Sequence, residues 1–440
     1  MKNRWIFRLY NLLLLAALPF ILVGVALRWR RRFARGLERW PERWGHLSPE
    51  KRAQFREGLP ASAKATAGNR LSSPLASGGG WWWVHAVSLG EAKSIEVFLR
   101  QIPRQTGARV LLSVVTPEAL AWAVENQVAQ EIIAAPIDLP WVVRRVARAV
   151  KPRLFVSVES EFWPNLLREA RRAGAKVALV NGRISARSYG RYRHIEGILP
   201  AVWECFDLVA VRQHEDASRF TDLGVPQRLV HVTGNLKYDL PLPQRANGAP
   251  ALDPLRLTLV VGSSREGEEK ELLPVMERLR RSYPTLRVIW APRHIDRIPE
   301  LERLFAEAGV ACAKKSEGAS AHLLWDSMGD LGDAYRQADI AVVGGSFVPK
   351  GGQNPLEPAA LSLPVVFGPS MENFHGISEV LVQQGGARQV TLPELGPCLA
   401  ELFERSDRRQ EMGRRARQAV ESRQGATDRT LALLKDLVHA

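Results

Sequence analysis

The sequence predicts an α/β protein built from two Rossmann-like domains that face each other across a cleft. From Trp81 onward, short apolar and β-branched runs alternate with helical patterns, which is typical of parallel strands buried between helices. The alternation occurs in two series of similar size, and a proline-rich segment without hydrophobic periodicity separates them. A chain of 440 residues is long enough for two domains with separate cores.

The elements of each series are expected in alternating order. The first series predicts strands at 81–87, 109–115, 153–159, 176–182 and 208–212, with helices at 91–102, 117–127, 139–150 and 163–174. The second predicts strands at 255–264, 286–293, 338–347 and 363–368, with helices that include 268–282 and 375–384.

The first 57 residues are strongly basic, with 13 Lys and Arg against four Glu, and carry +9 of the net charge of +15. Within them lies an apolar run at 11–27, about 25 Å long as a helix and at the short limit for a bilayer span. Arginines follow the run in place of a small-residue cleavage site, which argues against a signal peptide and for a cytoplasmic chain. We therefore expect an uncleaved anchor that spans the membrane or lies in its interface.

These patterns predict five regions. They are a basic membrane-anchor segment (1–57), a flexible linker or excursion (58–80), a first domain (81–240), a hinge (241–254) and a second domain (255–440). Because the basic excess is concentrated in the anchor segment, no nucleic-acid partner is expected. The three cysteines lie far apart, which excludes a cysteine-rich zinc site and argues against a disulfide framework.

Glu91 follows the first predicted strand and opens a helix. Ser88 and Glu91 fit the capping box S-x-x-E, and a carboxylate is stabilised at the positive end of a helix dipole. The alternative is catalytic, because a strand-to-helix turn displays side chains where a glutamate can take a proton from a substrate. From this stretch alone, the cap is the favoured interpretation.

Other polar residues also follow predicted strands, where ligands bind in such sheets. They are Glu159, Glu161, Asn181 and Arg183 in the first series, and Gly262, Ser263, Ser264, Arg293 and His294 in the second. The densest cluster is GGSFVPKGGQNPLEPA at 344–359. Its glycines allow tight turns, its backbone N–H groups are candidates to hold a phosphate at a helix start, and Glu357 is placed to bridge two ribose hydroxyls.

Several motifs are absent from the sequence. No P-loop and no G-x-G-x-x-G follows a strand, which counts against ATPases and nicotinamide enzymes. No H-E-x-x-H and no D-x-D triplet occurs, so we expect neither a metal nor a resident cofactor.

Seven blocks resemble the 3-deoxy-D-manno-octulosonic acid (Kdo) transferases of lipid A and lipopolysaccharide biosynthesis, in the order of that family. They are HAVSLGEAKS, ESEFWPNLL, NGRISARSYGRY, GNLKYD, APRH, DSMGDL and GGSFVPKGGQNPLEPAA. The resemblance runs from about Arg4 to the carboxyl terminus, without 58–80. It implies an inverting glycosyltransferase of GT-B fold on the cytoplasmic face of the inner membrane, which moves Kdo from CMP-Kdo to a lipid A precursor (lipid IVA) and releases CMP.

The resemblance also implies roles for particular residues. Glu91 corresponds to the general base, and a helix amino terminus would keep its carboxylate ionised. Glu159 and Lys237 correspond to groups that stabilise the transition state. Positions that bind CMP correspond to Pro292, Arg293, Met328, Gly329, Asp330, Asn354, Pro355, Leu356 and Glu357. The candidates for binding the phosphates of the acceptor are Arg183, Arg187, Arg191 and Arg193, for which a solvated basic face is the alternative.

The chain departs from the family pattern at two places near the expected donor site. Gln353 stands where the family often has histidine, and Ser264–Arg265 stands where it often has a threonine–histidine pair. Two other functions fit a similar architecture. One is a sugar-nucleotide 2-epimerase, which would be soluble and would turn over free UDP-sugar. The other is a membrane-tethered nucleotide-sugar binding module, which would need no base at Glu91.

Overall fold

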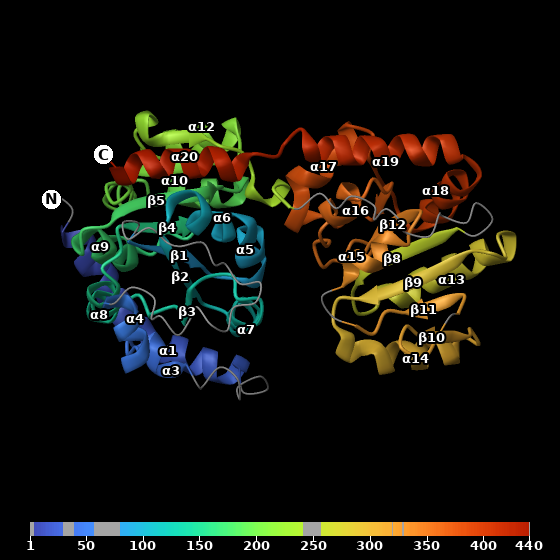
Figure 1. The fold of residues 1–440 in the computed structure, drawn as a ribbon, viewed down its shortest axis with the longest axis horizontal. Coiled ribbons are helices and arrows are strands. Elements are labelled where there is room, and N and C mark those ends of the chain that lie inside the picture. The colour runs from blue at the N-terminus through green and yellow to red at the C-terminus, as the bar shows by residue number, and fades with distance from the viewer. Residues whose placement is uncertain are drawn as a thin grey trace. The chain divides into compact units, whose positions relative to one another are not determined.

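The computed structural model describes residues 4–29, 39–56, 80–240, 257–318, 320–327 and 330–439. The chain divides into two compact units, each with a parallel seven-stranded sheet (Figure 1). Unit 1 comprises Met1–Asp239 and Gln424–Ala440, and unit 2 comprises Leu240–Arg423. The prediction of two parallel α/β sheets is confirmed. The predicted hinge at 241–254 and the predicted linker, except Gly80, lie outside the described residues.

The sheet of unit 1 has the strand order β3-β2-β1-β4-β5-β6-β7. Its strands are β1 (Trp81–Ala86), β2 (Arg109–Val114), β3 (Glu131–Ala134), β4 (Leu154–Val158), β5 (Lys176–Gly182), β6 (Leu208–Val211) and β7 (Val230–Val232). The chain leaves β1 toward β3 and then returns to β4 on the other side of β1. Ligands bind in such sheets at this switch point, outside the carboxyl ends of the two central strands.

Helices cover both faces of this sheet. They are α5 (Leu89–Ser94), α6 (Glu96–Thr106), α7 (Pro117–Glu125), α8 (Pro140–Val150), α9 (Pro164–Arg172), α10 (Ala186–Arg193), α11 (Pro200–Trp203) and α12 (His214–Asp222). Alternate residues of β1 enter different cores: Trp83 packs with apolar residues of α8 and α9, whereas Trp82 and Val84 pack with those of α5, α6 and α7. A strand buried on both faces explains the continuous apolar run of the sequence.

The predicted anchor segment is partly built into unit 1. It forms α1 (Arg4–Trp29), α3 (Trp40–Arg43) and α4 (Pro49–Arg56). Ile6 and Phe7 of α1 are buried in the unit 1 core, and the Tyr10 hydroxyl donates a 2.9 Å hydrogen bond to Asp138. Phe55 of α4 packs edge-on against Trp81 with ring centroids 4.8 Å apart. Among the helices of the described ranges, none is both long enough and apolar enough to cross a membrane.

The sheet of unit 2 has the order β10-β11-β9-β8-β12-β13-β14, with its switch point between β8 and β12. Its strands are β8 (Thr258–Ser264), β9 (Arg287–Pro292), β10 (Cys312–Lys314), β11 (His322–Leu324), β12 (Ile340–Val343), β13 (Val365–Phe367) and β14 (Ala387–Gln389). Its helices are α13 (Glu268–Ser282), α14 (Ile298–Glu307), α15 (Leu331–Arg336), α16 (Leu356–Ala360), α17 (His375–Gln383), α18 (Leu392–Glu404) and α19 (Ser406–Glu421).

The carboxyl-terminal helix corrects the predicted domain boundary. The predicted second domain extended to residue 440, but α20 (Ala426–His439) packs in unit 1 (Figure 1). Leu431 and Leu434 are fully buried in the core that also contains residues of α6. The Asp239 carboxylate accepts hydrogen bonds from the N–H groups of Gly425 (2.7 Å) and Thr427 (2.5 Å), which fixes the first turn of α20. Burial of its apolar side therefore assigns this helix to the first unit.

Candidate active site

Glu91 lies in the first turn of α5, the helix that follows β1 at the switch point of unit 1. Ser88 is the amino-terminal cap of α5, and its Oγ accepts the Glu91 N–H at 3.3 Å. The Glu91 carboxylate accepts hydrogen bonds from the Val87 N–H at 2.7 Å and from the Ser88 hydroxyl at 3.1 Å. The predicted cap therefore forms, although the return bond goes to Val87 and not to the N–H of Ser88. The same contacts fix the carboxylate at the end of the strand.

Glu159 and Lys237 come together beside the same switch point. Glu159 directly follows β4 with φ of +58°, a conformation that is uncommon outside glycine. Its carboxylate forms an ion pair with Arg212 and lies 3.7 Å from Lys237 Nζ. Burial acts to raise the pKa of Glu159, but the positive charges of Arg212, Lys237 and Arg183 hold it below its usual value. Glu159 is thus an ionised carboxylate in a cationic surrounding.

Lys237 lies in a segment whose backbone is fixed by hydrogen bonds to two asparagine side chains. It lies in a short 3-10 helix (Leu236–Tyr238), where the Asn235 side chain accepts the Lys237 N–H at 3.1 Å. Asn181, which is fully buried in β5, accepts the Leu236 N–H at 3.1 Å. Burial lowers the pKa of Lys237 to about 8, against the opposing effect of Glu159. The ammonium group is therefore fixed and mostly desolvated, which strengthens its interaction with a negative charge.

Burial is the main influence on the pKa of Glu91. The helix amino terminus was expected to keep the carboxylate ionised. Burial instead raises the pKa of Glu91 to about 7, and the negative charge of Glu161 adds to this effect. The carboxylate of Glu161 is held by the Trp163 indole N–H at 2.7 Å. A pKa close to neutrality is what general-base catalysis favours, because the group is available at working pH and still basic.

The four candidate acceptor arginines occupy different environments. Arg183 is half-buried and close enough to Glu159 to affect its pKa. Arg187, Arg191 and Arg193 lie on α10 and are exposed. The structure therefore brings Arg183 to the Glu159 cluster and leaves the other three on a basic helix surface.

In unit 2, Glu268 binds the backbone at the beginning of the glycine-rich loop that follows β12. This fully buried carboxylate accepts the N–H groups of Gly345 (2.6 Å), Ser346 (3.0 Å), Phe347 (2.9 Å) and Arg265 (3.1 Å). Farther along the loop, the Gly351 N–H donates to the Ser370 hydroxyl and the Gly352 N–H donates to the Gly345 carbonyl oxygen. These six N–H groups therefore have acceptors within the protein, and the predicted phosphate site at the start of α16 stays a prediction.

The remaining predicted donor-site residues form two groups. Just before α16, the Asn354 side chain accepts the Leu356 N–H at 3.1 Å, and its amide donates to Glu357 at 3.0 Å. Arg293 follows Pro292, the last residue of β9. Burial lowers the pKa of Arg293, and the negative charge of Glu357 opposes this effect. Pro355 directly precedes α16.

Asp330 forms its hydrogen bonds with a separate set of side chains. Its carboxylate accepts hydrogen bonds from Lys315 (2.6 Å), Ser327 (2.6 Å) and Trp325 (2.8 Å). Met328 and Gly329, the other two predicted residues of this block, lie outside the described part of the chain. Across the described ranges, no three His, Cys, Asp or Glu side chains form a group that could hold a metal ion.

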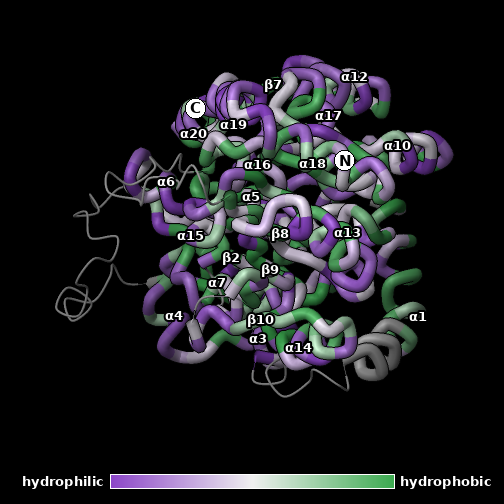
Figure 2. The backbone as a smooth tube through the Cα atoms, turned by 90° about the vertical axis from the view of Figure 1, so that its right-hand side faces the viewer, coloured by the Kyte–Doolittle hydropathy of each residue, from purple (hydrophilic) through white to green (hydrophobic). Residues whose placement is uncertain are grey.

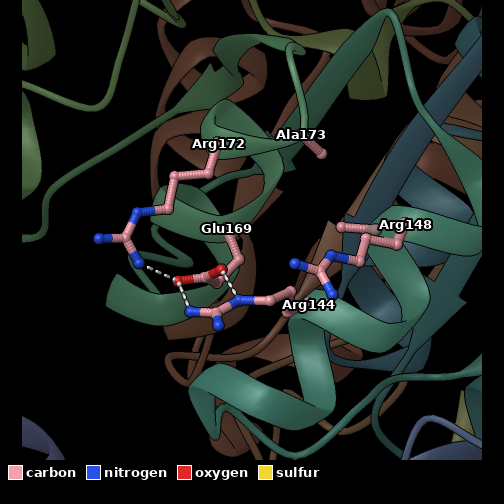
Figure 3. Close-up of a pocket in the computed structure, with 6 residues that line it drawn as sticks. Arg144, Arg148, Glu169, Arg172 and Ala173 are labelled. Carbon is pink, nitrogen blue, oxygen red and sulfur yellow. Dashed lines mark hydrogen bonds and ion pairs between the residues drawn. The ribbon is translucent and has the colours of Figure 1, made fainter.

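The pocket in Figure 3 contains none of the predicted site residues. It is a hollow of about 360 Å³ between α8 and α9. Glu169 accepts hydrogen bonds there from Arg144 (2.8 Å) and Arg172 (2.6 Å), and Arg148 lies beside them. These ion pairs join two neighbouring helices, and Glu169 itself is buried.

Sequence reasoning missed Arg212 and Glu268 as residues that organise the site. Arg212 directly follows β6, so the rule used for the other strand ends points to it as well. Glu268 is the first residue of α13, and an acidic residue there has the same capping interpretation as Glu91. No sequence pattern indicates that Glu268 reaches a loop 77 positions farther along the chain.

Two doubly wound parallel seven-stranded sheets make up a GT-B-like fold. The fold matches the UDP-GlcNAc 2-epimerase of Neisseria meningitidis with a TM-score of 0.56 at 11% identity, covering 81% of this chain and 99% of that one. It matches a glycosyltransferase from Rickettsia africae with a TM-score of 0.55 at 12% identity, covering 82% and 99%. Both matches concern the fold.

The sequence comparisons are more specific. The profile of the family described as "3-Deoxy-D-manno-octulosonic-acid transferase (kdotransferase)" matches residues 38–240. The 3-deoxy-D-manno-octulosonic acid transferase of Bordetella pertussis is 33% identical, covering 84% of this chain and 90% of that protein. The transferase of the same name from Haemophilus influenzae is 30% identical, covering 80% and 86%. The chain belongs to the Kdo transferase family and is a glycosyltransferase.

Proposed function

We propose that the protein transfers Kdo from CMP-Kdo to a sugar hydroxyl of a lipid A precursor, with inversion at the anomeric carbon and release of CMP. The observation that supports this most directly is the position of Glu91 and Glu159 after the central strands β1 and β4 of unit 1, with Lys237 Nζ 3.7 Å from the Glu159 carboxylate. Such a grouping supplies a base, a fixed negative charge and a fixed positive charge at the switch point of the sheet.

In this mechanism Glu91 takes the proton from the acceptor hydroxyl as its oxygen attacks the anomeric carbon. The new carbon–oxygen bond forms while the bond to the phosphate of CMP breaks, and CMP departs with the bonding electrons. Glu159, held by Arg212 and Lys237, faces the positive charge that develops on the sugar ring. Lys237 neutralises the negative charge of the departing phosphate. In unit 2, Arg293 and the segment Asn354–Glu357 bind CMP.

The experiment is mass spectrometry of a lipid A precursor after incubation with CMP-Kdo, using wild type and Glu91→Gln. We expect the lipid to gain mass in whole Kdo units and the variant to be roughly 10²–10⁴-fold slower, the usual contribution of a general base. Glu96→Gln, which alters a surface glutamate paired with Arg100, should match wild type. Unchanged lipid with turnover of free UDP-sugar would favour a 2-epimerase, and undiminished function in Glu91→Gln would favour a binding module.

We also propose that α1 attaches the enzyme to the cytoplasmic face of the inner membrane. Trp5, Leu12, Leu13 and Phe20 are between 57% and 80% exposed, and Figure 2 colours much of this helix as hydrophobic. The arginines at 28–39 add attraction to an anionic surface, about 1 kcal/mol for each basic residue near it.

This attachment predicts vesicle binding that depends on α1. We expect Leu12→Gln, Leu13→Gln and Phe20→Gln together to reduce co-sedimentation with anionic phospholipid vesicles. Val382→Gln, at an exposed apolar residue of unit 2, should leave it unchanged. Equal sedimentation of the triple variant and wild type would contradict a role for this helix surface.

A further inference from the structure

Arg265 lies at the switch point of unit 2, between β8 and β12. It directly follows β8, and the loop that begins at Gly344 directly follows β12, the strand next to β8. A Cβ atom added at Gly345 would lie 3.1 Å from Arg265 Cγ and 3.3 Å from Gln353 Nε2. The two places where the chain departs from the family pattern therefore lie together against one glycine of the donor-site loop.

The backbone at Arg265 is fixed. Its N–H donates to Glu268 at 3.1 Å, and the same carboxylate accepts the Gly345 N–H at 2.6 Å. The side chain extends to His294, with 3.3 Å between Arg265 Nη1 and His294 Nε2. His294 follows Arg293 at the end of β9. The guanidinium of Arg265 is thus directed toward the end of β9, which Arg293 directly follows.

Two guanidinium groups at these strand ends repel each other. Burial lowers the pKa of Arg293, and the positive charge of Arg265 lowers it further. Within the described ranges neither side chain forms an ion pair with a carboxylate, although Glu357 is near enough to affect Arg293. Uncompensated like charges are unfavourable in the protein alone and become favourable when an anionic ligand binds between them.

The donor of the proposed reaction carries two anions on one carbon. In CMP-Kdo, the anomeric carbon bears both the phosphodiester oxygen and the carboxylate of the sugar. The two negative charges of the donor therefore lie close together. A carboxylate matches the planar guanidinium with two parallel hydrogen bonds.

We propose that Arg265 binds the carboxylate of the donor sugar while Arg293 binds the phosphodiester. This inference rests on the proposed function. It assigns to Arg265 a role in recognising the sugar acid, at a position where the family pattern has a different residue. Donor sugars without the carboxylate lose this contact, so Arg265 also contributes specificity.

Steady-state kinetics of Arg265→Gln test the assignment, with Arg265→Lys as the conservative variant and Arg303→Gln as an exposed control in unit 2. We expect Arg265→Gln to raise KM for CMP-Kdo roughly 10–100-fold with little change in kcat, because a binding contact is lost. Inhibition by CMP, which lacks the carboxylate, should stay within about twofold of wild type. Arg265→Lys should recover part of the affinity.

Three outcomes would overturn the assignment. An unchanged KM in Arg265→Gln would show that the side chain does not bind the donor. A parallel loss of CMP inhibition would place Arg265 on the nucleotide part. A fall in kcat and thermal stability that Arg265→Lys does not rescue would indicate a structural role. If the wild-type enzyme transfers no Kdo at all, the proposed function also fails. That result differs from one in which the wild type transfers Kdo and Arg265→Gln is unaffected, which overturns only the assignment of Arg265.

Discussion

At the scale of single residues, the candidate base combines two roles that the sequence presented as alternatives. The contacts of Glu91 with Ser88 and Val87 stabilise the first turn of α5 and also fix its carboxylate at the end of β1. Its position after a strand was predictable from the local pattern. Its pKa was not, because burial and the approach of Glu161 depend on residues that the fold brings together.

The pKa values of Glu91 and Lys237 predict a narrow pH optimum. Glu91 must be deprotonated, so activity should fall as the pH drops through about 7. Lys237 must be protonated, so activity should fall as the pH rises through about 8. The profile of kcat/KM for Kdo transfer is therefore expected to be bell-shaped, and a flat profile across this range would contradict both assignments.

Glu161→Gln should move only the acidic side of that profile. The substitution removes a negative charge that raises the pKa of Glu91 while keeping an acceptor for the Trp163 indole. Glu91 would then stay ionised at lower pH, and the acidic limb should shift downward. Glu96→Gln serves as the control in the same profile, since its carboxylate pairs with Arg100 on the surface.

At the scale of secondary-structure elements, Glu268 joins two strand ends of unit 2. It begins α13, after β8, and its carboxylate binds the loop after β12 and the N–H of Arg265. One buried side chain thus sets the position of the donor-site loop relative to the β8 end. The Glu268 carboxylate can be buried because four N–H donors replace the hydrogen bonds that it loses to water.

Glu268→Ala should therefore destabilise unit 2 and weaken CMP binding. Four N–H groups would lose their acceptor, and an unsatisfied buried donor costs about 1–3 kcal/mol, so a loss of at least about 3 kcal/mol is expected. Thermal denaturation and CMP titration measure the two effects. Glu271→Ala, at an exposed position of the same helix, should change neither. Wild-type stability in Glu268→Ala would contradict the role of the carboxylate.

The sequence predicted the central strands and missed the short ones. β1, β2, β4, β5 and β6 of unit 1 correspond to long apolar runs, as do β8, β9, β12 and β13 of unit 2. The missed strands have three or four residues, and four of the five are at sheet edges: β3, β7, β10, β11 and β14. A strand of this length at an edge has too few buried residues to give a periodic signal.

At the scale of the whole molecule, the chain returns to its first unit. Unit 2 lies in sequence between Asp239 and Gln424, and α20 completes unit 1. Leu431→Ala and Leu434→Ala should each destabilise unit 1 by about 2–5 kcal/mol, because both side chains are fully buried. Asp436→Ala, on the exposed side of α20, should have little effect.

Hydrogen exchange can localise that effect. Peptides from β5 and α6 should lose protection in the two leucine variants, since they share unit 1 with α20. Peptides from β8 and β12 should keep it, because these strands form the core of unit 2. Loss of protection in β8 and β12 alone would contradict the assignment of α20 to the first unit.

The sequence by itself determined the two α/β series, the strand ends at which the candidate residues lie, and the family, through seven blocks in a fixed order. These features are local, since each depends on a few neighbouring residues. Tertiary structure alone decided that α20 belongs to unit 1, that Glu268 occupies the glycine loop, and that Arg212 and Lys237 surround Glu159. These depend on burial and on charges far apart in the chain, which no local pattern encodes.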